Sequence, residues 1–476
     1  MSHESAVLAS TEPPPPSGPL GVLQNLGIRF TGWTERWVPD AWVVALLLTV
    51  PVFVAAVIWG DANPFEATKA WGEGIWSLLT LMAQFSFAIV VAYAVATAPP
   101  VSRALNRLAS VPDKDKPWQA LLLMAAFALV TGWINWAVTI VASAVFVPYI
   151  AKNNPKVDYR LLVTAAYLGI GTIWHAGLSS SAPLIAATPG NFLIEQKILD
   201  DVIPVNETIF TTWNIGLSIV VAVVGMAIVV ALSPPADRAY TISPEEAEDI
   251  IGTSGTERPQ GPLTPAERME WWPGFNILFG IATAGYLIYV VVSQGFKGWT
   301  IDTYNLLFLS LALWLHFRPR PFLDACERGV RGAWGVLIVF PFFAGIFGMV
   351  QFTKLGEALA DLFASIASTN TFAPIVYWYS GILNYFVPSG GAKFAIEAPY
   401  ILPAGEAVGF SNAATTMAYA WGDMMSDMIQ PFWAIALLAI VRLRFGQIMG
   451  YCVVVWLAFL IVTTIGMFLL PADLGQ

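Results

Sequence analysis

Long apolar segments recur along the whole chain, with short polar segments between them. A helix needs about 20 consecutive apolar residues to cross a bilayer. On that measure the pattern predicts about nine transmembrane spans, at Ala41–Gly60, Trp71–Ala96, Tyr159–Ile194, Thr211–Leu232, Trp271–Gln294, Ile301–Phe317, Gly332–Phe352, Asn412–Ile440 and Gly446–Leu470. We therefore expect an all-α polytopic membrane protein.

Two further apolar segments do not fit a simple crossing. Trp118–Ile150 is interrupted at Asn135, and Phe372–Pro403 is interrupted by NYFVPSGG at residues 384–391. Lysines or arginines flank both ends of the first segment, which places both ends on the cytoplasmic side. Each segment is therefore predicted to be a re-entrant helical hairpin.

Two of the predicted spans contain strong helix breakers. HAGLSSSAP interrupts residues 159–194, and GDMMSDMIQP interrupts residues 412–440. Within a membrane, backbone that is not helical is tolerated only where it is buried in protein or lines a cavity. We expect both spans to be broken helices, with the breaks near the membrane midplane.

The hairpins and broken helices occur twice in the same order, which indicates an internal repeat. WINW at residues 133–136 aligns with ILNY at residues 382–385, an offset of 249. Residues 166–167 align with 418–419 at an offset of 252, and residues 182–183 with 430–431 at an offset of 248. One extra span between the halves makes the second copy inverted. The predicted divisions are a disordered cytoplasmic tail (1–28), a first repeat (29–233) with hairpin 118–150 and broken helix 159–194, a cytoplasmic linker (234–270), a linking helix (271–294), and a second repeat (295–476) with hairpin 372–403 and broken helix 412–440.

The distribution of basic residues indicates the orientation. With a cytoplasmic N-terminus, 18 of the 23 lysines and arginines lie in cytoplasmic segments and four lie in outer segments. Positive charge is enriched on the cytoplasmic side of membrane proteins. The expected topology therefore has the N-terminus inside and the C-terminus outside. Lys393, in the second hairpin, is the one basic residue that this topology does not place in water.

Composition agrees with a membrane protein and excludes several other classes. The chain is 57% hydrophobic and 12% charged, and it has no basic tract that would favour nucleic acid. Its two cysteines and three histidines have no metal or redox spacing, so no cofactor is expected. The bilayer is the expected partner, and the sequence leaves a homodimer open.

Inverted repeats with paired broken helices are typical of secondary transporters, whose binding sites lie at the repeat interface near the midplane. Backbone N–H groups and hydroxyls at the breaks suit an anion, whereas carboxylates, amides and unwound carbonyls suit Na⁺ or H⁺. We expect substrate contacts from Ser179, Ser180, Ser181, Ser389, Gly390, Gly391 and Lys393. Ion-coupling contacts, including any to Na⁺, are expected from Asn135, Asn384, Asp423 and Asp427.

Plainer interpretations exist for each group. Serines and glycines in membrane helices often serve close packing. Lys393 and Glu397 are four residues apart on one predicted helix and could neutralise each other. For Asp423 and Asp427, which have the same spacing, the functional interpretation is favoured instead, because facing acids tend to share a proton, which suits proton coupling or cation binding. His175 is interpreted as a satisfied buried histidine.

Several motifs together resemble the short-chain fatty acid transporter family. They are ERWVPDAW (35–42), WGEGIW (71–76), INW (134–136), SAPLIAATPGN (181–191), NYFVPSGG (384–391), QPFWA (430–434) and IMGYC (448–452). The resemblance implies uptake of short-chain carboxylates, such as butyrate or acetoacetate, across the bacterial inner membrane. It also implies the paired hairpins and broken helices of the ion-transporter superfamily. The chain departs from the family pattern at three positions. Lys393 stands where His or Gln is usual, Glu397 stands where Gln is usual, and Asp427 stands where an amide is usual.

The expected function is secondary active transport of a small monocarboxylate with H⁺ or Na⁺. A carrier of another organic anion on the same fold, a dicarboxylate or an aminobenzoyl-type compound, is the alternative. A membrane enzyme using Asp423, Asp427 and His175 lacks a supporting metal or nucleophile motif. A channel is disfavoured because a proton-linked carrier should saturate and reverse with the gradient.

Overall fold

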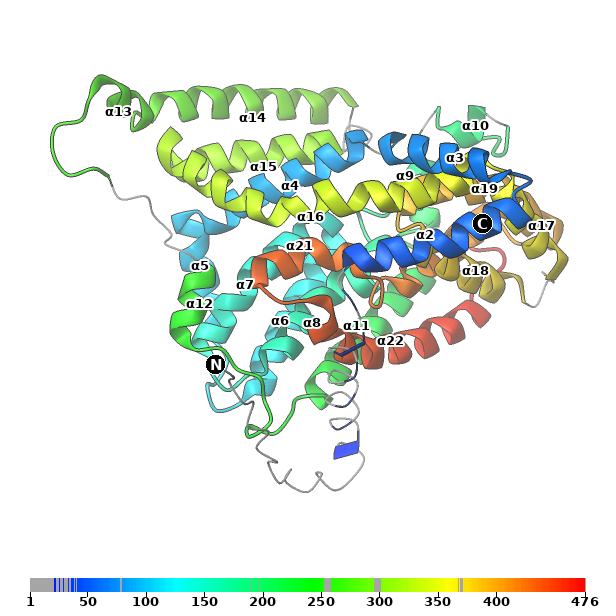
Figure 1. Ribbon diagram of the computed structural model, residues 1–476, viewed down its shortest axis with the longest axis horizontal. Coiled ribbons are helices and arrows are strands. Elements are labelled where there is room, and N and C mark those ends of the chain that lie inside the picture. The colour runs from blue at the N-terminus through cyan, green and yellow to red at the C-terminus, as the bar shows by residue number, and fades with distance from the viewer. Residues whose placement is uncertain are drawn as a thin grey trace, which may run out of the picture.

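Helices make up every element of the described part of the chain in the computed structural model (Figure 1). The structure describes residues 41–475 except 78, 189, 196, 252–257, 295–300, 367, 369 and 370, together with residues 21, 22, 25, 29, 33, 36, 37 and 39. Residues 1–20 of the predicted N-terminal tail lie outside the described residues.

The first half of the chain forms two short 3₁₀ turns and ten helices among its described residues. They are α2 (Ala41–Ile58), α3 (Pro64–Ser77), α4 (Leu79–Thr97), α5 (Pro99–Ala109), α6 (Pro117–Ile134), α7 (Trp136–Asn153), α8 (Tyr159–Thr172), η1 (Trp174–Ala176), α9 (Ser181–Ala187), α10 (Phe192–Glu195), η2 (Val205–Glu207) and α11 (Thr212–Ala231).

The linker and the second half form the remaining elements. They are α12 (Pro244–Ile251), α13 (Pro265–Glu270), α14 (Gly274–Gln294), α15 (Ile301–His316), α16 (Pro319–Phe352), α17 (Leu355–Ile366), α18 (Phe372–Phe386), α19 (Gly390–Ala407), α20 (Asn412–Asp423), η4 (Met424–Ser426), α21 (Pro431–Val441) and α22 (Phe445–Phe468).

The predicted helix breaks are present and locally capped. Asn135 is extended between α6 and α7, and its side-chain Oδ1 accepts a hydrogen bond from Val138 N at 2.9 Å. Gln430 caps α21 in the same way, through Phe432 N at 2.6 Å. Each cap satisfies an N–H that has no partner within its helix, which stabilises a helix that begins inside the apolar layer.

Close backbone packing holds the first hairpin against the first broken helix. A Cβ placed on Gly132 of α6 would lie 2.6 Å from Gly169 Cα of α8. Real Cβ atoms essentially never approach that closely, so the two helices can touch here only because both positions lack side chains.

The helices are long and apolar enough to confirm a polytopic membrane protein. Among the described residues, seven helices pass the length and hydropathy criteria for a span, or nine if each of two bent pairs is one span. The Tyr159–Ala187 span is 94% buried in the protein, whereas the Pro265–Gln294 span is 22% buried. The first broken helix therefore lies at the centre of the molecule and α14 at its edge. Two of the seven are the arms of the first predicted hairpin, Pro117–Ile134 and Trp136–Asn153, each with 18 residues. The re-entrant course of the hairpins, the inversion of the repeat and the sides of the two termini stay predictions.

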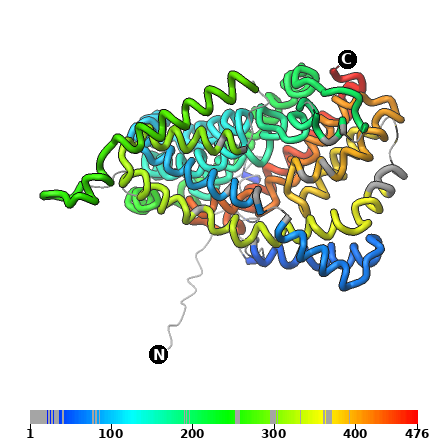
Figure 2. The backbone as a smooth tube through the Cα atoms, turned by 90° about the horizontal axis from the view of Figure 1, so that it is seen from above, coloured from blue at the N-terminus to red at the C-terminus, as the bar shows by residue number. Residues whose placement is uncertain are grey.

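Two groups of helices can be distinguished. In one, α14, α15, α4 and α16 pack against one another in that order, and α16 also packs against α2 and α3 (Figures 1 and 2). The other contains the hairpins and broken helices, where α18 packs on α20, α6 packs on α8, and α7 packs on α21. The second group brings the helix breaks from both halves of the chain together.

Two segments differ from the sequence expectation. The basic stretch around Arg318–Arg331 is not a loop, because α16 begins at Pro319, where proline favours the first turn of a helix. The linker also contains structure, since its helix α12 packs against α7. Glu248 of α12 pairs with Lys152 at the end of α7, and Asp249 pairs with Arg442 just after α21. The linker thus joins the ends of two helices that belong to different halves.

Candidate functional site

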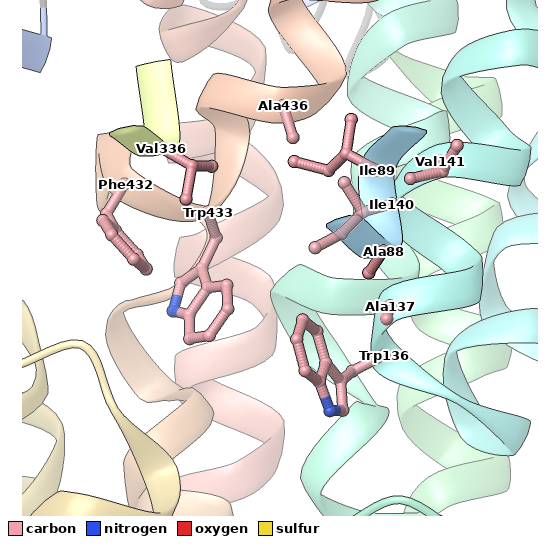
Figure 3. Close-up of a pocket in the computed structure, with 10 residues that line it drawn as sticks. All are labelled: Ala88, Ile89, Trp136, Ala137, Ile140, Val141, Val336, Phe432, Trp433 and Ala436. Atoms are coloured by element: carbon pink, nitrogen blue, oxygen red, sulfur yellow. The ribbon is translucent and has the colours of Figure 1, made fainter. Parts of the chain in front are cut away.

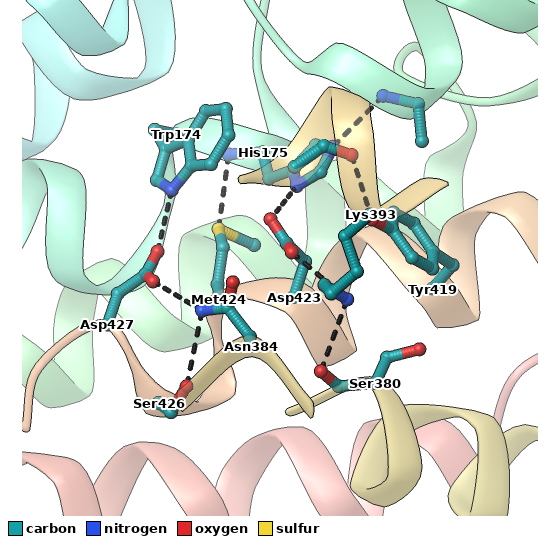
Figure 4. A network of polar contacts seen from close by, with 12 residues as sticks. Trp174, His175, Ser380, Asn384, Lys393, Tyr419, Asp423, Met424, Ser426 and Asp427 are labelled. Atoms are coloured by element: carbon teal, nitrogen blue, oxygen red, sulfur yellow. Dashed lines mark hydrogen bonds and ion pairs between the residues drawn. The ribbon is translucent and has the colours of Figure 1, made fainter. Parts of the chain in front are cut away.

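A network of buried polar side chains occupies the region where the breaks of the two halves meet (Figure 4). Its members come from η1 in the first half and, in the second, from α18, α19, α20, η4 and the residue directly after η4, Asp427. The central ionisable residues are at most 1% exposed; they are His175, Lys393, Glu397, Asp423 and Asp427.

The ammonium group of Lys393 is held by three oxygens. Its Nζ lies 3.0 Å from Glu397 Oε1, 3.1 Å from Asp423 Oδ1 and 3.2 Å from the main-chain carbonyl oxygen of Ser380. The same nitrogen lies 4.1 Å from the centre of the Tyr419 ring, a distance at which the ring face attracts a cation. Lys393 therefore pairs with Glu397, as one interpretation of the sequence proposed, and also with Asp423.

Glu397 has a second partner on the other arm of its hairpin. The hydroxyl of Ser380, on α18, donates a hydrogen bond to Glu397 Oε2. The carbonyl oxygen of Ser380 also accepts a hydrogen bond from Lys393 Nζ. Ser380 therefore connects α18 to both charged side chains of α19. The ion pair is thus part of the packing between the two arms of the second hairpin.

His175 connects the first half of the chain to this ion pair. Ala182 N, at the start of α9, donates to His175 Nε2 at 3.0 Å, so Nε2 carries no hydrogen. The hydrogen is then on Nδ1, which donates to Asp423 Oδ2 at 2.8 Å. This pattern assigns a neutral imidazole. His175 is a satisfied buried histidine, as expected, but one of its two partners is a carboxylate of the other half.

The side chain of Asp427 accepts hydrogen bonds from two neutral donors in the described part of the chain. Trp174 Nε1 donates to its Oδ2 and Asn384 Nδ2 donates to its Oδ1, each at 2.8 Å. Asn384 Nδ2 also lies 3.2 Å from Ser426 Oγ. Among the residues that the structure describes, Asp427 has no lysine or arginine in an ion pair.

The network holds more potential negative charge than positive charge. Three carboxylates, those of Glu397, Asp423 and Asp427, face one ammonium, and His175 is neutral. An unpaired ion costs several kcal/mol when it is buried away from water. The site therefore favours uptake of protons or other small cations to balance the remaining charge.

Two glycines at the start of α19 border this network. A Cβ on Gly390 would lie 2.8 Å from both Asp423 Oδ2 and His175 Cε1, so this position has no room for a side chain. A Cβ on Gly391 would lie 3.8 Å from Ser181 Cβ, at ordinary contact distance. The first turn of α19 thus lies beside Ser181, at the beginning of α9.

The structure gathers most of the predicted site residues and places a few beside them. Ser181, Asn384, Gly390, Gly391, Lys393, Asp423 and Asp427 lie in or against the network. The carbonyl oxygen of Ser389 accepts from Lys393 N at 2.9 Å. Asn135 and Ser179 meet at a neighbouring break, where Trp136 N donates to Ser179 Oγ at 2.9 Å. Ser180 is fully buried, and its Oγ has no hydrogen-bond partner among the described residues.

An apolar pocket lies next to this region, between the two groups of helices (Figure 3). Trp136 and Trp433 lie at one end, and aliphatic residues of α4, α7, α16 and α21 line the other. The cavity volume is about 40 Å³, which exceeds the room that one water needs. Trp174 contacts both Trp136 and Trp433, with ring centres 6.5 and 6.1 Å away, and its own Nε1 bonds to Asp427. One indole therefore separates the apolar pocket from the charged network.

Sequence reasoning did not identify four members of the network: Trp174, Ser380, Tyr419 and Ser426. Trp174 is next to the His175 break motif, and Ser426 is between the two aspartates, so proximity to a break was the usable signal for both. Ser380 and Tyr419 lie inside continuous helices α18 and α20, where no break marks them.

Comparisons with known proteins agree with the resemblance seen in the motifs. A model of the short-chain fatty acid transporter family matches residues 22–470. A relative from Escherichia coli (strain K12), provisionally named a short-chain fatty acid transporter, is 34% identical over 451 residues, 94% of this chain and 99% of the relative. A relative from Haemophilus influenzae with the same provisional name is 31% identical over 439 residues, 90% of this chain and 96% of the relative.

The fold can also be compared with solved structures. The YdaH transporter of Alcanivorax borkumensis matches with 14% identity and a TM-score of 0.47, covering 90% of this chain and 98% of that one. The family assignment rests on the sequence matches. The chain belongs to the short-chain fatty acid transporter family and is a membrane transporter, not an enzyme.

Proposed function

We propose that the protein is a secondary active transporter that moves a small monocarboxylate, of the butyrate or acetoacetate type, together with H⁺ or Na⁺. The observation that carries this proposal is the charge imbalance of the buried network, in which three carboxylates face one ammonium. An anion that binds beside such a network adds to the uncompensated negative charge. It can therefore bind well only together with a cation, which is the physical requirement for symport.

The carboxylate of the substrate is proposed to bind at the start of α19. Helix N-termini present backbone N–H groups and a partial positive charge, both of which favour anions. At this helix start Gly391 lies beside Ser181, and Ser389 lies one helical turn before Lys393. Ser179 and Ser180 would supply further hydroxyls from the first broken helix. The positive charge of Lys393, which Glu397 and Asp423 hold in place, would attract the substrate carboxylate electrostatically.

The coupling ion is proposed to bind at Asp427, with Asn384 beside it and Asp423 in the same network. A carboxylate held by an indole N–H and an amide, without a basic partner, is suited to take up a proton. Asn135 at the neighbouring break offers a matching amide. A Na⁺ ion would use the same oxygens.

The apolar pocket favours a monocarboxylate over the alternative dicarboxylate. Its lining carries no acidic or basic side chain, so a second carboxylate placed there would be buried without a partner. An alkyl tail, in contrast, gains free energy from leaving water, about 0.8 kcal/mol for each CH₂.

Uptake by proteoliposomes that contain the purified protein tests the proposal. Labelled butyrate and succinate would be offered under an imposed pH gradient, an imposed Na⁺ gradient, or neither. We expect saturable butyrate uptake that one of the two gradients drives above equilibrium. Saturable succinate uptake without butyrate uptake would refute the proposed substrate class.

The variant Asp427→Asn tests the coupling role. It should lose gradient-driven accumulation while keeping exchange of labelled for unlabelled butyrate, because exchange needs no net ion movement. Asp249→Asn, at an exposed carboxylate of the linker, is the matched control and should keep both. Full accumulation by Asp427→Asn would remove Asp427 from the coupling site.

A further inference from the structure

The surroundings of Lys393 have the composition of a cation site. An ammonium group has three N–H donors and no acceptor, and Lys393 Nζ has three oxygen neighbours at 3.0, 3.1 and 3.2 Å. Two of these oxygens are carboxylate oxygens, and the third is a main-chain carbonyl oxygen. Lys393, Glu397 and Asp423 are all at most 1% exposed.

We propose that these oxygens form a site for one monovalent cation, which the ammonium of Lys393 occupies permanently in place of Na⁺. The inference rests on the proposed function and narrows it, because a carrier with a tethered cation in this site needs no Na⁺ for its cycle. Substrate transport is then coupled to protons, which bind the carboxylates that Lys393 does not neutralise.

The types of ligand support a monovalent cation. Carboxylate and carbonyl oxygens are the hard donors that alkali ions bind, and the Tyr419 ring face lies on the same cation at 4.1 Å. In the described part of the chain, no group of three or more His, Cys, Asp or Glu side chains is arranged to hold a metal ion. The three oxygens around Lys393 Nζ already hold a monovalent cation, the ammonium itself.

The position of the site explains why a cation is needed there. Ser380 lies on α18, Lys393 and Glu397 on α19, and Asp423 at the end of α20. The cation therefore joins both arms of the second hairpin to the second broken helix. Without it, Glu397 and Asp423 would face each other as buried like charges, a strongly destabilising arrangement.

The other charged or titratable groups that face Lys393 do not replace it. His175 approaches from η1, but it is neutral and donates to the far oxygen of Asp423. Tyr419 approaches from α20, and its hydroxyl donates to Gly390 O at 2.8 Å. Asp427 follows η4 and adds negative charge. Removal of the ammonium therefore leaves a vacant oxygen site with an excess of negative charge.

The test removes the tethered cation and offers a free one. Purified Lys393→Ala would be unfolded thermally in detergent with NaCl or with choline chloride at equal ionic strength. We expect Na⁺ to stabilise this variant specifically, with about a tenfold shift in the unfolding equilibrium when Na⁺ is at ten times its Kd. The wild-type protein should respond equally to both salts, and its butyrate uptake should be the same in both.

A double variant controls for general effects of salt. Lys393→Ala combined with Glu397→Gln keeps the space but leaves one carboxylate, so its preference for Na⁺ should fall sharply. Lys393→Gln serves as a second variant if the alanine variant does not purify as a folded protein. Butyrate uptake by either single variant should depend on Na⁺.

Two results would overturn the inference. One is Na⁺-stimulated butyrate uptake by the wild-type protein, which can be measured whether or not any variant folds. The other is a folded single variant that responds equally to Na⁺ and choline. Failure of the proposed function would look different, because the unfolding measurements use no substrate. A wild-type protein that carries no carboxylate could still show the Na⁺ site in Lys393→Ala.

Discussion

Gly390 provides a sharp test of the network, because its neighbour Gly391 provides a matched control. A Cβ on Gly390 would lie 2.8 Å from Asp423 Oδ2, 2.8 Å from His175 Cε1 and 2.9 Å from a Trp174 ring carbon. All three neighbours are buried, so Gly390→Ala must push them apart. Overpacking of this kind costs about 1–3 kcal/mol. Breaking the 2.8 Å hydrogen bond between His175 and Asp423 adds about 1.5–3 kcal/mol.

The same substitution one residue later meets none of these atoms. The nearest neighbour of a Cβ on Gly391 is Ile185 Cδ1, at 3.7 Å, which is an ordinary contact. Gly391→Ala should therefore keep or slightly raise stability, since alanine is favoured over glycine in a helix by about 0.5–1 kcal/mol. The two variants should differ by about 2.5–7 kcal/mol in unfolding free energy.

Thermal unfolding of both purified variants at one scan rate measures this difference, and butyrate uptake measures its functional effect. Gly390→Ala should unfold at a clearly lower temperature and lose uptake. Gly391→Ala should unfold like the wild-type protein, and any change should be confined to the KM for the carboxylate. Equal stability of the two variants would refute the contact between the start of α19 and the pair formed by His175 and Asp423.

Three further predictions address other parts of the molecule. Trp174→Phe keeps an aromatic side chain but removes the indole N–H, one of the two side-chain donors to Asp427. Because the buried carboxylate then lacks a hydrogen bond, the unfolding free energy should fall by about 1–3 kcal/mol and uptake should decrease. Ala436→Leu fills part of the apolar pocket, so competition by carboxylates of increasing length should weaken by about fourfold for each methylene that no longer fits. The pair Glu248→Gln and Asp249→Asn removes two exposed ion pairs of the linker, so unfolding free energy should change by only about 0–1 kcal/mol, and this small effect should vanish at high salt.

The helices and their breaks could be predicted because the relevant signals are local. Apolar length sets the spans, and the sequences around Asn135, Gly390 and Pro431 contain residues that end or begin helices in any surroundings. The same reasoning identified Lys393 as the basic residue without access to water, and the structure buries it completely. The helical start of α16 was missed because a run of basic residues says nothing about backbone conformation.

The partners within the site could not be predicted in the same way. Ser380 and Tyr419 matter because α18 and α20 turn those particular faces towards Lys393. Hydrophobic periodicity does not reveal these faces, since every residue of α20 after Asn412 is buried. A buried helix has no polar side from which the direction of its side chains can be read.

One long-range signal was nevertheless present in the sequence. His175 and Asp423 are 248 positions apart, and His175 N approaches Met424 Sδ across 249 positions. These separations equal the offset that relates the two predicted repeats. In an inverted repeat, residues near the twofold axis contact their own counterparts, so the predicted repeat would place contacts at this offset where its two copies meet. The offset of the predicted repeat would therefore have been enough to suggest that His175, at one break, contacts Asp423, at the other.

Lys393 does not follow this symmetry. Its oxygen partners lie 4 residues away at Glu397, 13 away at Ser380, and on Asp423, all within the second half. One offset of 249 earlier, the first hairpin has Ala144 and Pro148 in place of Lys393 and Glu397. The contact between His175 and Asp423 thus matches the offset of the predicted repeat, whereas the ammonium and its carboxylate have no counterpart at that offset. A substitution at Lys393 should accordingly alter the ion requirement and leave the crossing of the two halves intact.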